Sequence, residues 1–502
     1  MAIASPVGVC ILPPNTETGE TMKTIASLIG ALAALALASS ANADPAATRV
    51  ETGALVGKTV GDIVVFRDIP YAAPPVGASR WKPPGKPLAW TGARDATANG
   101  PSCMQVMNAG GMPNAGGAAG PVSEDCLTLN VFAPKGAARA PVMLWIHGGS
   151  NLWGAGSIYD GSAFARDGVV FIAINYRMGA FGFFAHPALT KEAPGAQPLA
   201  NYALMDQIAA LKWVKRNAAA FGGDPGNVTV FGESAGAIDI LALLGMPSAD
   251  GLFNRAIMES NIGWGGAKPF AAQEANGSII ATRLGLAGAQ ASADQLRAAP
   301  ADKLLAAQAG LRNLASTTID GRMVTQSAYS AIAAGKGLDV PIVIGSNSFE
   351  ASLIAGSPGV TPQTEADFTN GLAGSPARWV AGRFNAKGSP AWLYFFSYVR
   401  SASRATAPGA GHASEIPYAY NWFGPFGPPS DEDKAEAALM HSCWVAFAKT
   451  GAPACASGPT WPTYAADSDQ LLEFGTGGDA VRTHFRKAEM DASEQKAALT
   501  KP

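Results

Sequence analysis

A serine lies between two glycines in the segment Gly232–Gly236, which reads Gly-Glu-Ser-Ala-Gly. The short apolar segment Val228–Phe231 before it is typical of a buried strand, and the Ala- and Leu-rich segment from about Ala235 is typical of a helix. A sharp turn between strand and helix holds its central residue in a strained conformation, and small neighbours avoid clashes there. The pattern therefore predicts that the hydroxyl of Ser234 projects over the edge of a sheet as a candidate nucleophile.

The segments around this motif repeat the alternation of strand and helix. Three continuous apolar runs, Leu127–Phe132, Val142–Ile146 and Val169–Ile174, are typical of strands buried on both faces. Asn201–Arg216 has apolar residues at helical spacing and ends in Lys-Arg, as helix C-termini favour. This alternation predicts an α/β fold with a large, mostly parallel central sheet flanked by helices, and we expect residues 44–502 to form one such domain.

Two further regions are interpreted as additions to this sheet. Residues 54–66 are rich in Val and Ile and predict an antiparallel hairpin at a sheet edge. The Ala-rich stretch Pro269–Leu314 predicts a set of short helices. We interpret it, together with Thr361–Arg404, as cap material over the carboxyl edge of the sheet, where ligands bind in folds of this kind.

A serine hydroxyl does not attack an ester unaided, so a base must lie near Ser234 in space. In the α/β-hydrolase fold, which has this strand–turn–helix nucleophile, the order along the chain is serine, acid, histidine. Three histidines follow the serine, and His412 is the one in a glycine-rich loop. His441 falls within a predicted helix, Glu436–Thr450, and His484 lies near the charged C-terminal end. We therefore choose His412 as the candidate base.

The acid partner is expected between Ser234 and His412, after a strand. Val340–Ile344 is that predicted strand, and Glu350 lies in the loop that follows it. A carboxylate there would accept the imidazole Nδ1–H, fix the tautomer and stabilise the imidazolium formed when the base takes the serine proton. Glu415 is a competing carboxylate, but it lies only three residues beyond the histidine, and we interpret it as a local structural partner.

Backbone donors for a developing oxyanion are expected after the strand Val142–Ile146. The segment Trp145–Ser150 contains two glycines, which let main-chain N–H groups approach a negative charge. We expect the N–H groups of Gly149, Ser150 and Ala235 to form the oxyanion hole. No cluster of metal-ligating residues accompanies these segments, so neither a metal nor an organic cofactor is expected.

The overall charge also restricts the partners. The chain has 36 Lys and Arg residues against 38 Asp and Glu residues, so it lacks the basic field that holds a phosphate backbone. Nucleic acid is therefore not an expected partner, and a small-molecule ester is.

The N-terminal region has the three parts of a secretory signal. A short basic region begins at Met22, the apolar run Ile25–Ala38 follows, and small residues ending at Ala43 form a cleavage site. The apolar run has 14 residues, which is too short to span a bilayer core of about 30 Å, so no membrane span is expected. We predict a signal peptide over residues 22–43 and a secreted or periplasmic protein. Residues 1–21 fit neither a signal nor a fold, and a translation start at Met22 would account for them.

Four cysteines lie beyond the predicted cleavage site: Cys103, Cys126, Cys443 and Cys455. They permit three pairings, and an exported protein retains disulfides. We choose the pairing that is local in sequence, Cys103 with Cys126 and Cys443 with Cys455. None of the four has a Cys-x-x-Cys spacing, so a structural zinc site is not expected.

The chain resembles the type-B carboxylesterases, relatives of the cholinesterases and the bacterial p-nitrobenzyl esterases. Phe221–Gly236 is similar to the nucleophile signature of that family, and Glu124–Val131 is similar to its second signature. The resemblance spans about Val50 to Phe474 and implies an α/β-hydrolase fold and an acyl-enzyme mechanism. It also implies a triad of Ser234, Glu350 and His412, and Cys103–Cys126 as the first disulfide. Further matches to family landmarks are Asn201–Gln207, His412–Tyr418 and Trp461–Tyr464.

Three regions depart from the family pattern. Ser150-Asn151 stands where the family usually has a third glycine followed by an aromatic residue. The segment from Glu350 to His412 is short for the family, which implies a reduced helical cap and a more open gorge. Ser260-Asn261 stands where Ser-Gly is common, close to the expected triad.

These observations predict a secreted serine carboxylesterase with a Ser-His-Glu triad. An amidase, a lactonase or a specialised hydrolase of natural-product esters is the alternative among enzymes, because an open gorge would admit a bulky substrate. A catalytically inactive, cholinesterase-like binding protein is the alternative from another class. It is disfavoured because all three triad positions are filled.

Overall fold

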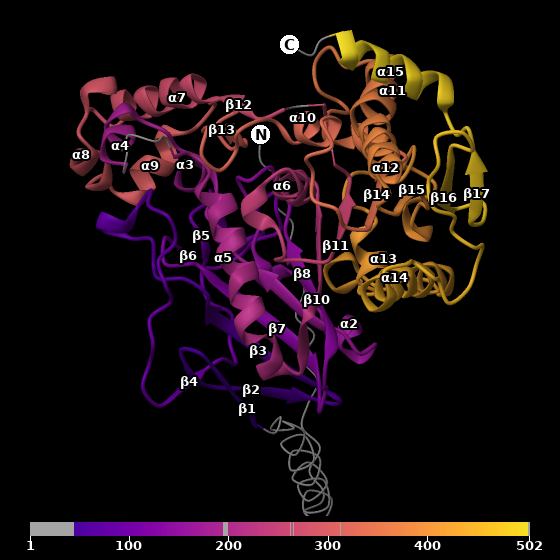
Figure 1. The fold of residues 1–502 in the computed structure, drawn as a ribbon, viewed down its shortest axis with the longest axis horizontal. Coiled ribbons are helices and arrows are strands. Elements are labelled where there is room, and N and C mark those ends of the chain that lie inside the picture. The colour runs from indigo at the N-terminus through magenta and orange to yellow at the C-terminus, as the bar shows by residue number, and fades with distance from the viewer. Residues whose placement is uncertain (1–44, 194–198, 262, 265, 312, 500–502) are drawn as a thin grey trace, which may run out of the picture. The chain divides into compact units, whose positions relative to one another are not determined.

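The computed structural model describes residues 45–193, 199–261, 263–264, 266–311 and 313–499 (Figure 1). The predicted signal peptide and the segment before it lie outside the described residues. Pro45–Pro502 groups into one unit by its internal contacts. In the described part of the chain, no helix combines the length and apolarity needed to cross a membrane.

A large mixed sheet forms the centre of this unit, as predicted. Every pairing from β9 to β16 in its spatial order is parallel, whereas the successive strands at both ends pair antiparallel. The short strand β4 (Ala93–Asp95) lies off this order and pairs parallel with β2. β2 and β3 form the predicted antiparallel hairpin, and β1 lies outside it as the edge strand. In spatial order the strands are β1 (Pro45–Val50), β2 (Gly53–Val60), β3 (Ile63–Pro70), β7 (Thr128–Pro134), β9 (Val170–Ile174), β8 (Ala140–Ile146), β10 (Gly223–Glu233), β11 (Arg255–Glu259), β14 (Ile342–Asn347), β15 (Ala391–Ser397), β16 (Gln470–Gly475) and β17 (Ala480–Thr483).

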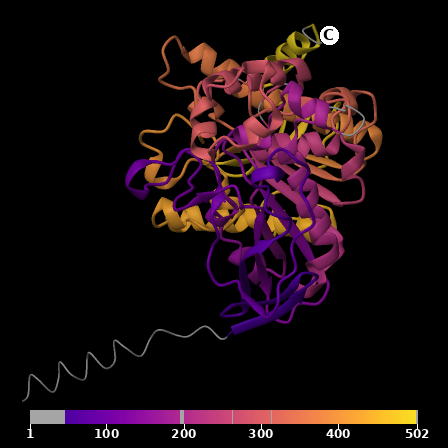
Figure 2. The ribbon, with the colours of Figure 1, turned by 90° about the vertical axis from the view of Figure 1, so that its left-hand side faces the viewer.

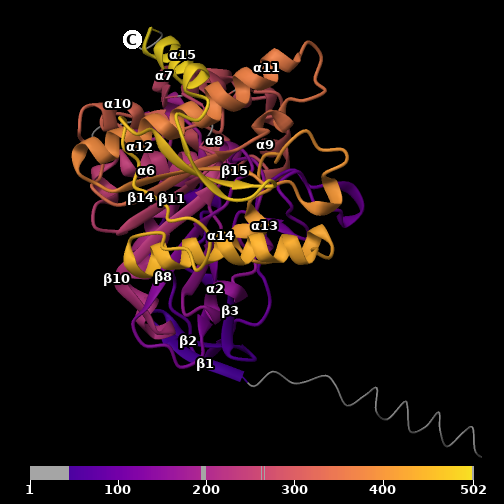
Figure 3. The same cartoon turned by 90° about the vertical axis from the view of Figure 1, so that its right-hand side faces the viewer.

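Helices cover both faces of the sheet, because its central strands are apolar on both sides. Along β8, Leu144 and Ile146 belong to one buried cluster, and Met143 and Trp145 belong to another on the opposite face. α5 (Tyr202–Asn217), α6 (Ala235–Leu244) and α12 (Ser375–Lys387) contribute to the first cluster. α2 (Ser162–Arg166) and α14 (Asp431–Thr450) contribute to the second, and two side views show α14 as a long helix against the sheet (Figure 2 and Figure 3).

The predicted helix Glu436–Thr450 is α14, which begins five residues earlier than expected. Ser430 accepts a hydrogen bond from the N–H of Asp433, and the Asp433 carboxylate accepts one from the N–H of Ser430. This reciprocal cap satisfies donors that the first turn leaves free, so the polar residues after Ser430 are helical.

The interpretation of Thr361–Arg404 as cap material is wrong for its C-terminal half. After α11 (Pro362–Ala366), a π-helical segment (Asp367–Gly374) and α12, the chain enters the central sheet as β15. All but the last residue of β15 are buried, because it pairs on both sides with parallel strands. Its run of Trp, Leu, Tyr and Phe is a strand signal of the kind that predicted the others.

The stretch Pro269–Leu314 forms short helices, as predicted. They pack with α3 (Gly179–Gly182) and α4 (Pro187–Glu192) around a separate apolar cluster that includes Phe184, Ile280 and Leu296. The short strands β12 (Lys268–Pro269) and β13 (Thr318–Ile319) pair with each other and bring together the chain segments before and after these helices. The helices are α7 (Phe270–Arg283), α8 (Ala293–Arg297) and α9 (Ala301–Ala307), and α10 (Ala328–Ala333) follows β13.

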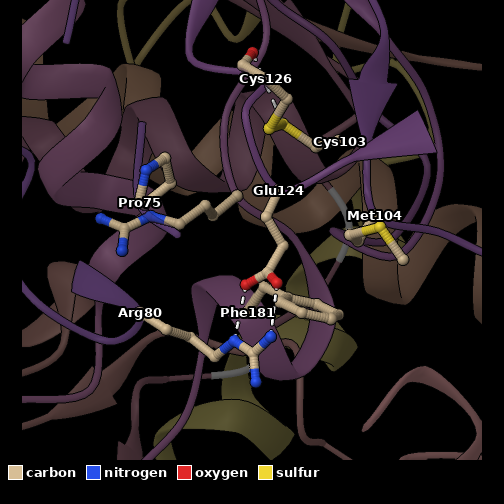
Figure 4. Close-up of a pocket in the computed structure, with 8 residues that line it drawn as sticks. Pro75, Arg80, Cys103, Met104, Glu124, Cys126 and Phe181 are labelled. Carbon is tan, nitrogen blue, oxygen red and sulfur yellow. Dashed lines mark hydrogen bonds and ion pairs between the residues drawn. A yellow bond between two sulfur atoms is a disulfide. The ribbon is translucent and has the colours of Figure 1, made fainter. Parts of the chain in front are cut away.

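Both disulfides are present with the local pairing, Cys103–Cys126 and Cys443–Cys455. The first lies beside an ion pair in which the Arg80 Nε donates to a Glu124 carboxylate oxygen at 2.6 Å (Figure 4). Phe181 lines the same small space.

We expect replacement of both Cys103 and Cys126 by serine to lower the free energy of unfolding by about 3 kcal/mol, because the bridge closes a loop of 23 residues. Urea unfolding followed by tryptophan fluorescence measures this difference. The matched control is the double replacement of Cys443 and Cys455, whose loop of 12 residues predicts a slightly smaller loss. An unfolding curve that matches the wild type would contradict the prediction.

Candidate active site

Ser234 occupies the turn between β10 and α6, with φ 56° and ψ −120°. Its N–H donates to the carbonyl of Glu259 in β11 at 2.9 Å. A Cβ added at Gly232 or at Gly236 would lie 2.5 or 2.0 Å from the carbonyl oxygen of Ile146 in β8. Both glycines are therefore required, because the strained turn is pressed against the neighbouring strand.

The loops after β14 and β15 bring Glu350 and His412 together. Phe349 and Gly411 form an isolated parallel bridge, which aligns the two loops. The Glu350 Oε2 lies 2.6 Å from the His412 Nδ1. The Glu350 Oε1 accepts hydrogen bonds from the N–H of Asn347 at 2.7 Å and from the hydroxyl of Ser260 at 2.5 Å. Each carboxylate oxygen thus has its own partners, which fix the orientation of the group.

The opposite side of the imidazole faces Glu233, the residue before Ser234. The His412 Nε2 lies 3.0 Å from the Glu233 Oε1, so the ring lies between two carboxylates and beside the strained turn. Burial by itself lowers the pKa of His412, but the charges and hydrogen bonds of Glu233 and Glu350 outweigh it and raise the pKa above its ordinary value of 6.5.

Glu415, the competing carboxylate, does not contact His412. Its oxygens accept hydrogen bonds from the Asn347 side-chain amide and, at 3.3 Å, from the hydroxyl of Ser260. Burial, together with the negative charges of Glu233 and Glu350, raises the pKa of Glu415 to about 8. Its neutral form is therefore favoured at neutral pH, and it acts as a structural neighbour of the His–Glu pair.

We expect Glu233→Gln to shift the acidic limb of the pH profile of kcat/KM to lower pH. The charge of Glu233 favours the protonated imidazole, and a base must be neutral to accept a proton. Loss of that charge lowers the pKa of His412, so the neutral base persists at lower pH. Hydrolysis rates measured from pH 5 to pH 10 test this, and an unmoved or upward-shifted limb would contradict it.

Of the predicted oxyanion residues, Gly149 and Ser150 lie in the loop after β8, and Ala235 begins α6 directly after Ser234. Gly149 has φ 95° and Ser150 has φ 58°, so this loop is left-handed at a residue other than glycine. Among the described residues, the N–H groups of Gly149, Ser150 and Ala235 donate no hydrogen bond. The three donors are thus available to an acceptor that enters the site.

A cavity of about 330 Å³ opens onto Ser234. Ser150, Asn151 and Ala235 line it near the serine. Asp239, in α6, also lines it, and burial raises the pKa of this carboxyl to about 7 against the effect of its hydrogen bonds. Other lining residues come from β12, the segment before β13, and α10, and include Lys268, Thr317 and Tyr329.

Sequence reasoning missed the contacts of Glu233, Asn347 and Asp239. Glu233 stands at the variable position of the serine motif, which carries no signal by itself. Asn347 ends β14, and only the fold shows that its amide reaches Glu415. Asp239 did offer a signal, because it is the one charged residue in the otherwise apolar helix α6.

A strained serine between a parallel strand and a helix, with a histidine and a carboxylate supplied by loops after later strands, defines an α/β-hydrolase. The chain belongs to the carboxylesterase family, whose model matches residues 44–370 and 357–493. The resemblance noted in the sequence is thereby confirmed.

Two relatives and one solved structure illustrate the similarity. The para-nitrobenzyl esterase of Bacillus subtilis (strain 168) is 35% identical over 478 residues, which cover 84% of this chain and 93% of the relative. The fumonisin B1 esterase of Sphingopyxis macrogoltabida is 33% identical over 488 residues, covering 86% and 87%. A solved structure of PNB esterase superposes with a TM-score of 0.80 at 31% identity, over 89% of this chain and 99% of that one. The protein is accordingly a carboxylic ester hydrolase.

Proposed function

We propose that the protein is an exported serine esterase that hydrolyses small-molecule carboxylic esters through Ser234, His412 and Glu350. The observation that carries the proposal is the imidazole of His412, held by Glu350 at Nδ1 and positioned beside the strained turn of Ser234. Ser234 lines a cavity that is large enough for a small ester, and His412 contacts Glu233, the residue directly before the serine.

In the proposed acylation step, the Ser234 Oγ attacks the ester carbonyl carbon while the His412 Nε2 takes the hydroxyl proton. The carbonyl oxygen becomes negative and accepts hydrogen bonds from the N–H groups of Gly149, Ser150 and Ala235. The imidazolium returns its proton to the leaving alcohol, which departs as the C–O bond breaks and leaves an acyl-enzyme. Water then attacks the acyl carbon by the same proton transfers and releases the acid and free Ser234.

Two carboxylates support the imidazolium in this scheme. Glu350 holds a proton at Nδ1, so the Nε2, which lies 3.0 Å from the Glu233 Oε1, is the nitrogen that takes the serine proton in this scheme. Glu233 adds a second negative charge beside the Nε2. Both charges become more favourable as the ring becomes cationic, so both stabilise the transition state more than the resting enzyme.

A fluorophosphonate probe and a series of p-nitrophenyl esters from acetate to decanoate test the proposal. We expect one covalent adduct, located at Ser234 by peptide mapping, and hydrolysis whose chain-length profile reports the size of the acyl pocket. Anilides and lactones assayed in parallel test the amidase and lactonase alternatives. Folded protein that neither labels nor hydrolyses any of these compounds would favour the binding-protein alternative.

The export part of the proposal rests on the sequence of residues 22–43. N-terminal sequencing of material exported from a bacterial host is expected to begin at Asp44. Exported protein that retains residues before Met22 would contradict both the cleavage site and the proposed translation start.

Lys268 gives the cavity a charge preference that can be tested. It is the only Lys or Arg among the described residues that line the cavity, and it forms no ion pair with a described carboxylate. An ester with a remote carboxylate would supply the missing partner.

We therefore expect Lys268→Met to raise KM about fivefold for p-nitrophenyl hydrogen glutarate, as for a partly exposed ion pair, and to leave KM for p-nitrophenyl valerate unchanged. Lys268→Arg is the matched control and should retain the wild-type KM for the glutarate ester. Equal changes for the charged and neutral esters would rule out a charge contact.

A further inference from the structure

Asp239 is a buried carboxyl group without a cationic partner in the described part of the chain. It is fully buried in α6, five residues after Ser234. Its Oδ1 accepts a hydrogen bond from the Asn151 Nδ2 at 3.1 Å, and its Oδ2 accepts one from the Gln207 Nε2 at 2.6 Å. No described Lys, Arg or His forms an ion pair with it. Burying a carboxyl group without a cationic partner costs folding free energy, so a functional role is a reason for the chain to retain it.

Asn151 belongs to the loop that carries the candidate oxyanion donors. Ser150 and Asn151 have φ 58° and 57°, so two consecutive residues other than glycine are left-handed. The Asn151 carbonyl accepts a hydrogen bond from the N–H of Gly179 at 2.7 Å. The Asn151 Oδ1 lies 3.0 Å from the hydroxyl of Tyr176, which also lies 2.7 Å from the carbonyl of His147.

These contacts connect α6 to the loop at the same end of the cavity. The residue that follows Ser234 in α6 supplies one candidate oxyanion donor, and Gly149 and Ser150 supply the others. The Asp239–Asn151 hydrogen bond joins the two groups of donors through side chains. Both side chains line the cavity that contains Ser234. The loop and α6 are therefore connected by a polar contact between buried side chains.

We propose that Asp239 is a positioning residue, which through its hydrogen bond to Asn151 holds the Gly149–Ser150 segment with its N–H groups toward the oxyanion. The proposal rests on the proposed function, because the oxyanion hole is part of it. The strained loop then depends on one carboxyl group in α6, and this group does not itself touch the reacting atoms.

The second partner of Asp239, Gln207, allows two variants of Asp239 to be compared. Its Oε1 is buried and has no hydrogen-bond partner. In Asp239→Asn the new amide can keep its oxygen toward Asn151 and donate its NH₂ group to the Gln207 Oε1 after the Gln207 amide flips. Leucine in Asp239→Leu has a similar shape but offers no hydrogen-bond acceptor, so this variant loses the hydrogen bond to Asn151.

The test measures kcat and KM for p-nitrophenyl acetate with purified full-length mature protein. We expect Asp239→Leu to lower kcat 10- to 100-fold with KM within twofold, because loss of an oxyanion donor acts in the transition state. Asp239→Asn should retain at least a third of the wild-type kcat. In an Asn151→Gly background, Asp239→Leu should cause no further loss, because the pair acts as a unit.

Several results would overturn the proposal. They are a wild-type kcat in Asp239→Leu, a raised KM with kcat unchanged, and independent effects in the Asn151→Gly background. If Asp239→Leu does not fold by circular dichroism, Asn151→Gly alone decides, because it should lower kcat about tenfold and a wild-type kcat there overturns the proposal. Wild-type protein that hydrolyses no ester would instead contradict the proposed function, so the two failures are distinguishable.

Discussion

Ser234→Ala is expected to lower kcat for p-nitrophenyl ester hydrolysis by about 10⁵-fold or more, to a rate near the background of the folded protein. The variant retains the proposed oxyanion donors and the cavity but lacks the hydroxyl oxygen that would form the proposed acyl-enzyme. Its backbone should be unaffected, because alanine is no more strained than serine at φ 56° and keeps the N–H bond to Glu259. Saturation kinetics with the acetate ester, together with fluorophosphonate labelling, measure the loss.

Ser316→Ala is the matched control for this experiment. Ser316 lines the same cavity, and the change removes the same hydroxyl group from a residue that is not in the proposed triad. We expect its kcat to stay within about twofold of the wild type, as is usual for a substitution that leaves no buried group unpaired. Comparable losses in both variants, or hydrolysis that survives in Ser234→Ala, would contradict a nucleophilic role for Ser234.

The strand-to-helix turn was predictable from the sequence because all its determinants are local. Gly232, Ser234 and Gly236 lie within one turn, and the apolar strand before them is recognisable by itself. The chain order of the fold then restricted the histidine to three candidates, and loop context selected His412. The structure places this residue next to Glu350, although 62 residues separate the two in the sequence.

The surroundings of the candidate triad were not predictable, because they depend on pairings between distant strands. Asn347 lies only three residues before Glu350, but Ser260 follows β11, and the parallel pairing of β11 with β14 places its hydroxyl beside Glu350. The same limit explains the misinterpretation of β15. Its apolar run matches a buried strand, but it follows a helical stretch that resembles cap material, and the partners of β15 in the sheet are far away in sequence.

Two further carboxyl groups, those of Glu259 and Glu415, are buried on the His412 side of the site. Burial raises the pKa of Glu259 and of Glu415, and nearby negative charges add to the shift in both. The raised pKa values of these two groups disfavour additional negative charge next to the carboxylates that contact the imidazole. A second ionised carboxylate beside Glu350 would be costly in this buried environment.

Glu350→Gln is expected to lower kcat about 10⁴-fold by fixing the wrong tautomer of His412. The N–H of Asn347 is a buried donor that needs an acceptor, so the new amide oxygen must take the place of the Glu350 Oε1. The NH₂ group then faces the His412 Nδ1, which must become an acceptor, and the ring proton moves to Nε2. There it is 3.0 Å from the Glu233 Oε1, which stabilises a tautomer that cannot accept the serine proton.

Glu415→Gln is the matched control, because it makes the same chemical change in the neighbouring buried carboxyl. Glu415 is largely neutral near pH 7 and does not touch His412, so its loss removes little charge and leaves the tautomer unchanged. We expect a kcat reduced less than tenfold, measured with the acetate ester at pH 7. The reverse order, with Glu415→Gln the more damaging change, would show that Glu415 orients the imidazole and would contradict the assignment of Glu350.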